Sequence, residues 1–170
     1  MSANAGFEGP LYRALNPIWA ADPLSGEGAQ RYGGRFNPLG VPALYCSLSP
    51  HTAIREANQV GDLQPTTLVA YRALIDRVFD CRDEVAVRHA GLDPAELGDP
   101  AWREAMRRQG EAPTQRFARR LIAERWPGML VRSFARGSGP DDLNLVLWRW
   151  GEKPPARLEV VDDEGRLKPL

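Results

Sequence analysis

Cysteine and histidine are scarce in this chain of 170 residues. There are only two of each, namely Cys46, Cys81, His51 and His89. They form neither a C-x-x-C pair nor an H-E-x-x-H helix, which are the spacings that bring zinc ligands together. We therefore expect no metal site, and we expect both cysteines to be reduced, as in a cytoplasmic protein.

The chain also lacks an excess of charge of either sign. Lys and Arg together number 22, and so do Asp and Glu, which gives a formal net charge of zero at pH 7. A protein that binds a nucleic-acid backbone needs a basic stripe to neutralise phosphates, so direct binding to DNA or RNA is not expected. Arginine nevertheless dominates the cations, and its planar guanidinium suits local recognition of phosphate groups.

Long apolar runs are absent as well. No stretch approaches the roughly 18 apolar residues of a membrane span, and residues 1–10 lack the basic start and apolar core of a signal peptide. We therefore expect a cytoplasmic protein with no membrane partner. Because 43% of the residues are hydrophobic and no repeat or linker divides the chain, residues 1–170 are expected to form one domain, with residues 1–10 flexible.

Apolar patterns predict short strands and helices that do not alternate regularly, which is typical of the α+β class. The clearest helix start is Ser49-Pro50, because Ser49 can cap free amides and Pro50 suits the first turn. This helix is expected to end near Asn58. Residues 25–40 contain five glycines and one proline, which favours a long functional loop over a regular element. Strands are expected at 11–14, 41–46, 68–75, 129–132, 143–150 and 158–161, and further helices at 99–110 and 114–126.

Signatures of the common enzyme classes are missing. The chain has no G-x-S-x-G elbow, no Walker loop and no G-x-G-x-x-G after a strand. What remains is an ordered set of polar and aromatic residues around the run GGRFNPLG at residues 33–40, here called the glycine loop. In chain order, this set consists of Arg13, Tyr32, Arg35, Tyr45, Glu56, Ser133 and Asn144.

This succession resembles the RES domain, a family named for an arginine, a glutamate and a serine. In this sequence those residues would be Arg35, Glu56 and Ser133. The resemblance extends from about residue 12 to residue 148, and it is most specific over the glycine loop, Tyr45 and Glu56. Before the serine, the run GMLVRS departs from the Gly-Ile-x-Tyr-Pro-Ser that is common in the family.

The resemblance implies a mixed β core of short strands flanked by helices, as in ADP-ribosyltransferases, and an activity that consumes NAD⁺ as a substrate. It also implies the toxin half of a bacterial type II toxin–antitoxin pair that inhibits growth. An Xre-like (ParS-like) antitoxin would cover the active site, in a complex that can be oligomeric. ADP-ribose would pass either to a protein acceptor or, by hydrolysis or phosphorolysis, to water or phosphate.

The residues fit this chemistry. Cleavage of the nicotinamide–ribose bond creates positive charge on the ribose, so a nearby carboxylate is needed, and Glu56 is the candidate. Arg35 is the second candidate catalytic residue, and with Arg13 it would hold the pyrophosphate. We expect the tyrosines to stack on nicotinamide and the serine to fix Arg35 or the nicotinamide amide. The expected ligand-binding residues are Arg13, Arg35, Tyr32, Tyr45 and Ser133, and no metal is required.

Two other functions stay open at this point. A non-catalytic module would use the same arginine pocket to bind a nucleotide or the carboxylate of a partner. A toxin that targets nucleic acid is a third possibility, against which the neutral charge argues. Glu56 on its own would be a helix-surface residue paired with an arginine such as Arg72, and Tyr45 on its own a core residue.

Overall fold

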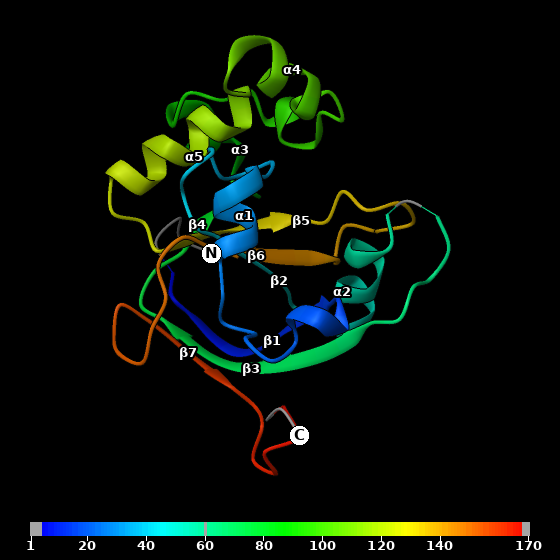
Figure 1. Cartoon of the computed structure of the whole chain (residues 1–170). Helices are drawn as coiled ribbons and strands as arrows, with labels where there is room; N and C mark the ends of the chain where they lie inside the picture. Colours follow the sequence, from blue (N-terminus) through cyan, green and yellow to red (C-terminus); the bar gives the residue numbers. More distant parts are fainter. Residues whose placement is uncertain (1–4, 60, 168–170) are drawn as a thin grey trace.

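A seven-stranded sheet forms the centre of the protein in the computed structural model, which describes residues 5–59 and 61–167 (Figure 1). The strands are β1 (Phe7–Leu15), β2 (Leu44–Ser47), β3 (Thr67–Ile75), β4 (Phe79–Asp80), β5 (Gly128–Arg132), β6 (Leu143–Leu147) and β7 (Ala156–Val160). Their order is β4-β5-β6-β2-β1-β3-β7, and β4–β5 is the parallel pair while the others are antiparallel. The α+β class is confirmed.

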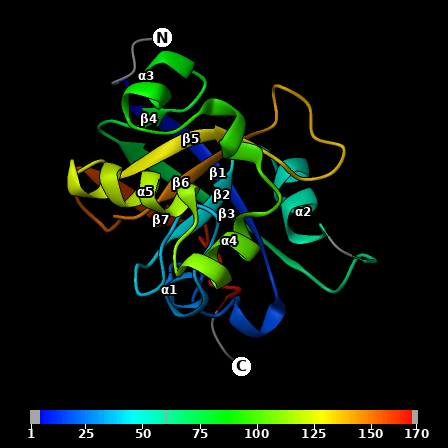
Figure 2. The same cartoon turned by 90° about the horizontal axis from the view of Figure 1, so that it is seen from above.

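Within the described residues, five short α-helices and two 3₁₀ helices surround this sheet. They are η1 (Pro17–Trp19), α1 (Glu27–Tyr32), α2 (Pro50–Ala57), α3 (Glu84–His89), η2 (Pro94–Gly98), α4 (Trp102–Gln109) and α5 (Pro113–Ala123). Figure 2 shows α2 on one side of the sheet, separated from α3 and α5. In residues 5–59 and 61–167, no helix has the length and apolar character needed to cross a membrane.

Two apolar clusters hold these layers together. The first lies between α3, α5 and the β4–β5–β6 part of the sheet, with Phe117 and Leu121 of α5 against Met129 and Val131 of β5. The second joins residues of β1, β3 and β7 to residues of β2, β5 and β6. Since the second cluster takes side chains from both halves of the sheet, the sheet must curve over it, as Figure 1 shows. Alternate residues of β5 and β6 serve the two clusters, as expected for strands buried on both faces.

Most predicted elements are present within a few residues of their expected bounds, but the structure corrects four expectations. Residues 7–10, expected to be flexible, form the first part of β1 and pair with β3, while residues 1–4 lie outside the described part. The glycine-rich segment contains the helix α1. The strand expected at 143–150 ends at Leu147. The elements η1, β4, α3 and η2 were not predicted, because each has six residues or fewer and too little sequence to show a period.

Candidate functional site

A cavity of about 370 Å³ lies between the glycine loop, β1, α2, α4 and the adjoining ends of β5 and β6. Its volume is in the range of pockets that bind small ligands. Five charged side chains line it in the described part of the chain: Arg13, Arg35, Arg103, Arg132 and Glu56. Four positive charges against one negative charge favour an anionic ligand.

Glu56 reaches this cavity from the last turn of α2. The helix begins where the sequence predicts, since Ser49 accepts a hydrogen bond from the Thr52 amide at 3.1 Å and Pro50 occupies the first turn. Thr52 and Ala53 are buried. Glu56 follows them by one turn, which places it at the edge of the buried face and on the cavity wall.

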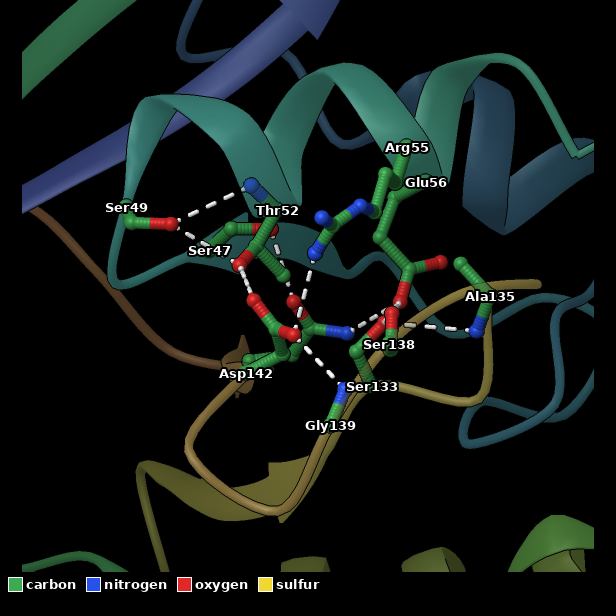
Figure 3. A network of polar contacts seen from close by, with 11 residues as sticks. Ser47, Ser49, Thr52, Arg55, Glu56, Ser133, Ala135, Ser138, Gly139 and Asp142 are labelled. Atoms are coloured by element: carbon green, nitrogen blue, oxygen red, sulfur yellow. Dashed lines mark hydrogen bonds and ion pairs between the residues drawn. The ribbon is translucent and has the colours of Figure 1, made fainter.

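Three side-chain amides and hydroxyls donate hydrogen bonds to the Glu56 carboxylate. Its Oε1 atom accepts from the Ser133 hydroxyl at 2.5 Å and from the Asn144 amide at 2.6 Å, and its Oε2 atom accepts from the Gln59 amide at 2.5 Å. Figure 3 shows the carboxylate facing Ser133, which comes from a different part of the chain. Because an ionised carboxylate only accepts hydrogen bonds, these donors fix its orientation at the cavity wall.

Asn144 takes its orientation from the sheet. It lies in β6 and pairs with Ser47 of β2 on one side and with Val131 of β5 on the other. The Ser47 hydroxyl donates to its Oδ1 atom at 2.7 Å. That bond leaves the amide nitrogen of Asn144 for Glu56, so the register of three strands determines one contact of the carboxylate.

Ser133 directly follows β5, and its hydroxyl contacts Glu56 instead of Arg35. Its hydroxyl donates to Glu56, accepts from the Ala135 amide at 3.2 Å and lies 2.9 Å from the Ser138 hydroxyl. In the described structure, therefore, Ser133 orients Glu56 and does not hold Arg35. The sequence could not show this contact because residues 56 and 133 are 77 positions apart.

Arg35 is tied to the segment between η2 and α4. Its Nη1 atom donates to the carbonyl oxygens of Leu97 at 3.1 Å and Asp99 at 3.2 Å, and its guanidinium lies 5.0 Å from the centre of the Phe134 ring. Burial lowers the pKa of Arg35, and the negative charge of Glu56 opposes this effect. The side chain remains a cation near neutral pH, because an arginine pKa starts far above that range. In the described residues its Nε and Nη2 atoms make no hydrogen bond to protein, so they can bind a ligand.

Arg13 belongs to β1 and also lines the cavity. Its Nη1 atom donates to the carbonyl oxygen of Pro23 at 3.0 Å, and the Tyr71 hydroxyl donates to the same oxygen at 2.7 Å. These bonds fix the direction of the guanidinium. The structure thus brings Arg13 and Arg35 to one cavity, as the sequence analysis expected.

Tyr45 lines the cavity, but its hydroxyl forms hydrogen bonds with the glycine loop. It donates to Asn37 Oδ1 at 2.6 Å and accepts from the Phe36 amide at 3.0 Å. Burial raises the pKa of Tyr45, so the hydroxyl keeps its proton and can donate. The side chain of Asn37 is fully buried and donates to the carbonyl oxygens of Ala29 and Val41. Tyr45 therefore shapes the loop that carries Arg35.

Gln115 and Trp148 anchor the same loop from outside it. The buried Gln115 amide donates to the carbonyl oxygens of Gly34 at 2.9 Å and Asn37 at 3.2 Å. The Trp148 indole donates to the Phe36 carbonyl at 2.7 Å. Buried backbone carbonyls need such partners, so α5 and the residue after β6 hold the glycine loop in its conformation.

Gly34 gives a direct test of this packing. A Cβ atom at residue 34 would overlap Tyr45 Oη and Asn37 Oδ1. We expect Gly34→Ala to lower the free energy of unfolding by about 1–3 kcal/mol, the usual cost of overpacking, as measured by urea denaturation. The control is Gly28→Ala, because a Cβ atom at residue 28 meets nothing within 4 Å. Equal stabilities of the two variants would contradict the packing argument.

Within the described residues, Tyr32 does not line the cavity, and Arg72 is not the partner of Glu56. Tyr32 ends α1, its side chain is 69% exposed, and in the described structure it is not among the residues that line the cavity. The alternative partner for Glu56 is wrong, since Arg72 pairs with Asp163 at 3.0 Å. No group of three or more His, Cys, Asp or Glu side chains that would hold a metal occurs within residues 5–59 and 61–167.

Several residues of the site were missed by the sequence analysis. They are Gln59, Arg103, Gln115 and Arg132, which contact Glu56 or the glycine loop or line the cavity. Arg132 adjoins Ser133, and Arg103 lies on a predicted helix, so both had a weak positional signal. Gln115 stands at the start of a predicted helix, where a buried polar side chain is unusual, but nothing in the sequence indicated its partners.

A model of the RES domain family matches residues 10–169. Among solved structures, the chain is similar to a chain in the crystal structure of the M. tuberculosis MbcT–MbcA toxin–antitoxin complex. The TM-score is 0.64 at 22% sequence identity, and the match covers 92% of this chain and 83% of that chain. A comparison with curated protein sequences finds no match.

Proposed function

Because the chain belongs to the RES domain family, we propose that it is the toxin of a bacterial toxin–antitoxin pair and that it cleaves the nicotinamide–ribose bond of NAD⁺. The observation that carries this proposal is one carboxylate, Glu56, fixed by Ser133 and Asn144 on the wall of a cavity with four arginines. The substrate has the matching features, namely a ribose that becomes cationic and a pyrophosphate that is anionic. The enzyme would act in the cytoplasm, where the NAD⁺ pool lies.

Glu56 supplies the chemistry at the ribose. As the bond between C1′ of the ribose and the nicotinamide nitrogen breaks, its electron pair leaves with nicotinamide, which becomes neutral, and positive charge develops on the ribose. A fixed carboxylate stabilises that charge without having to reorient during the reaction. A nucleophile then bonds to C1′ and loses a proton, which gives ADP-ribose attached to the acceptor.

The arginines supply binding. We assign the pyrophosphate to Arg35 and Arg13, because guanidinium groups donate paired hydrogen bonds to phosphate oxygens. Both side chains are already oriented by backbone carbonyls of neighbouring segments. Arg103 and Arg132 line the same cavity and add to its positive potential. The ring of Tyr45 is a further contact for a flat group, while Tyr32 is not assigned a role at the ligand.

An antitoxin partner is the second part of the proposal. The similar structure is a toxin–antitoxin complex, and the cavity is bordered by the aromatic ring of Phe134, which is 39% exposed. We propose that an Xre-like antitoxin covers this opening and blocks the entry of NAD⁺, in a complex that can contain several copies of each chain. Addition of the purified antitoxin to the toxin is then expected to abolish nicotinamide release.

The central experiment measures nicotinamide release from NAD⁺ by the purified protein without its antitoxin. Release that is faster in phosphate buffer identifies phosphate as the acceptor, and release that is independent of phosphate identifies water. If release is slow in both buffers, a lysate with labelled NAD⁺ shows whether a protein accepts ADP-ribose. Binding of NAD⁺ with neither nicotinamide nor labelled protein would replace the enzyme by a non-catalytic binding module.

A further inference from the structure

The connection between β5 and β6, residues 133–142, is fastened to α2 by one carboxylate. Asp142 Oδ1 accepts a hydrogen bond from the Thr52 hydroxyl at 2.6 Å, and its Oδ2 atom accepts from Arg55 Nη1 at 3.0 Å and from the Gly139 amide at 2.7 Å. Figure 3 shows Asp142 between the helix and the loop. One side chain thus joins two turns of α2 to the segment that starts with Ser133.

The backbone of Asp142 completes a closed circuit with Glu56. The Ser133 amide donates to the Asp142 carbonyl at 2.8 Å, while the Ser133 hydroxyl donates to Glu56 at 2.5 Å. Thr52 lies one helical turn before Glu56. The path therefore runs from Glu56 to Ser133, from Ser133 to Asp142, and from Asp142 back to the helix that carries Glu56.

Thr52, the residue by which α2 takes part in this circuit, is held by burial and by hydrogen bonds. Thr52 is fully buried, and its hydroxyl contacts Ser49 at 2.8 Å as well as Asp142. The Thr52 hydroxyl, the Gly139 amide and Arg55 together hold the pKa of Asp142 below its ordinary value. The carboxylate is therefore ionised at neutral pH and can accept all three hydrogen bonds. In the described chain, Asp142 is not among the residues that line the cavity.

We propose that Asp142 is a positioning residue for the cleavage reaction: by fastening residues 133–142 to α2, it sets the contact between Ser133 and the Glu56 carboxylate. This inference rests on the proposed function, because Glu56 must be the group that acts on the ribose. Fixed geometry matters for such a group, since a displacement of about 1 Å can cost on the order of 10²-fold in rate. Asp142 then affects the transition state through Glu56 and leaves substrate binding largely to the arginines.

Asp142→Asn tests this role in nicotinamide release. The asparagine has no charge for Arg55, and its amide nitrogen cannot accept from the Gly139 amide. We expect kcat to fall by about 10- to 100-fold with KM for NAD⁺ changed by less than about twofold, as for an interaction that acts in the transition state. The matched control is Asp163→Asn, because Asp163 also pairs with an arginine at 3.0 Å but lies outside the cavity wall. Equal kcat values in the two variants would overturn the proposal.

Thr52→Val tests the same link from the helix. Valine keeps the volume of Thr52 but removes the hydroxyl that donates to Asp142. Because both residues act through one link, we expect the double variant Thr52→Val, Asp142→Asn to lose little more activity than Asp142→Asn alone. Full additivity of the two losses in kcat would contradict a shared role.

A readout that needs no substrate separates this inference from the proposed function. The Ala135 amide donates to the Ser133 hydroxyl, so its hydrogen-exchange rate reports whether Ser133 keeps its place. Exchange at Ala135 should be faster in Asp142→Asn and unchanged in Asp163→Asn. If the parent protein releases no nicotinamide, the proposed function fails, whereas unchanged exchange in Asp142→Asn overturns the positioning role in either case.

Discussion

Replacement of Glu56 by Gln is expected to lower kcat for nicotinamide release by about 10²–10³-fold, the usual effect of removing a preoriented electrostatic group. The glutamine has the same shape, and its carbonyl oxygen can still accept from Ser133 and Asn144, while the exposed Gln59 amide turns its oxygen toward the new NH2 group, so the fold of the site is retained. What is lost is the negative charge beside the developing positive charge on the ribose. Because the substrate has less positive charge at that carbon before the bond breaks, KM should change little.

The control for this prediction is Glu27→Gln on α1, where the glutamate side chain is 72% exposed. This variant should keep the parent activity. A melting temperature measured for each variant separates a catalytic loss from unfolding. A Glu56→Gln variant with the parent kcat would remove Glu56 from catalysis. NAD⁺ binding that is unchanged by the substitution, with no turnover in either protein, would favour the binding module.

Replacement of Arg35 by Ala is expected to weaken NAD⁺ binding by about 10- to 100-fold, since hydrogen bonds to charged groups contribute about 1.5–3 kcal/mol. The reason is that Arg35 lines the cavity, and its Nη1 atom is held by Leu97 and Asp99 while Nε and Nη2 make no hydrogen bond within the described residues. Calorimetric titration with NAD⁺ measures the effect. The titration is done in the Glu56→Gln background, in which the substrate is consumed slowly.

Arg77→Ala is a closely matched control for Arg35→Ala. Arg77 also lies over an aromatic ring, that of Trp126 at 4.3 Å, and donates to a backbone carbonyl, that of Glu124 at 3.0 Å. It does not line the cavity in the described structure. The affinity of Arg77→Ala for NAD⁺ should equal that of the parent. The affinity of Arg35→Ala should depend less on salt concentration than the affinity of the parent or of Arg77→Ala. Equal affinities of the two variants would exclude Arg35 from pyrophosphate binding.

Local sequence was sufficient for the elements whose signals are short in range. The capped start of α2 is present because Ser49 and Pro50 act on the amides of the first turn next to them. The alternation of residues in β3 predicted that strand to within one residue of its start. α1 was missed because the bonds from Asn37 to Ala29 and from Gly40 to Gln30 support a helix that its glycines disfavour.

The order of Arg13, Arg35, Tyr45 and Glu56 along the chain predicted a common site, and in the fold all four line one cavity. Order indicates which residues belong to a family pattern, but it does not indicate what each atom contacts. The Tyr45 hydroxyl bonds to Asn37 of the glycine loop, and Tyr32 is exposed and does not line the cavity in the described structure.

The sequence by itself therefore determined the α+β class, the helix that carries Glu56 and three of the charged residues around the cavity, namely Arg13, Arg35 and Glu56, because these depend on spacing and on capping over a few positions. Only the tertiary structure decided that Ser133 bonds to Glu56, that Gln115 holds the glycine loop and that Asp142 fastens its segment to α2. Each of these contacts joins residues more than 75 positions apart. The contacts of Ser133 and Asp142 exist because the pairing of β5 with β6 and of β6 with β2 brings these distant segments together, while that of Gln115 exists because α5 packs beside the glycine loop.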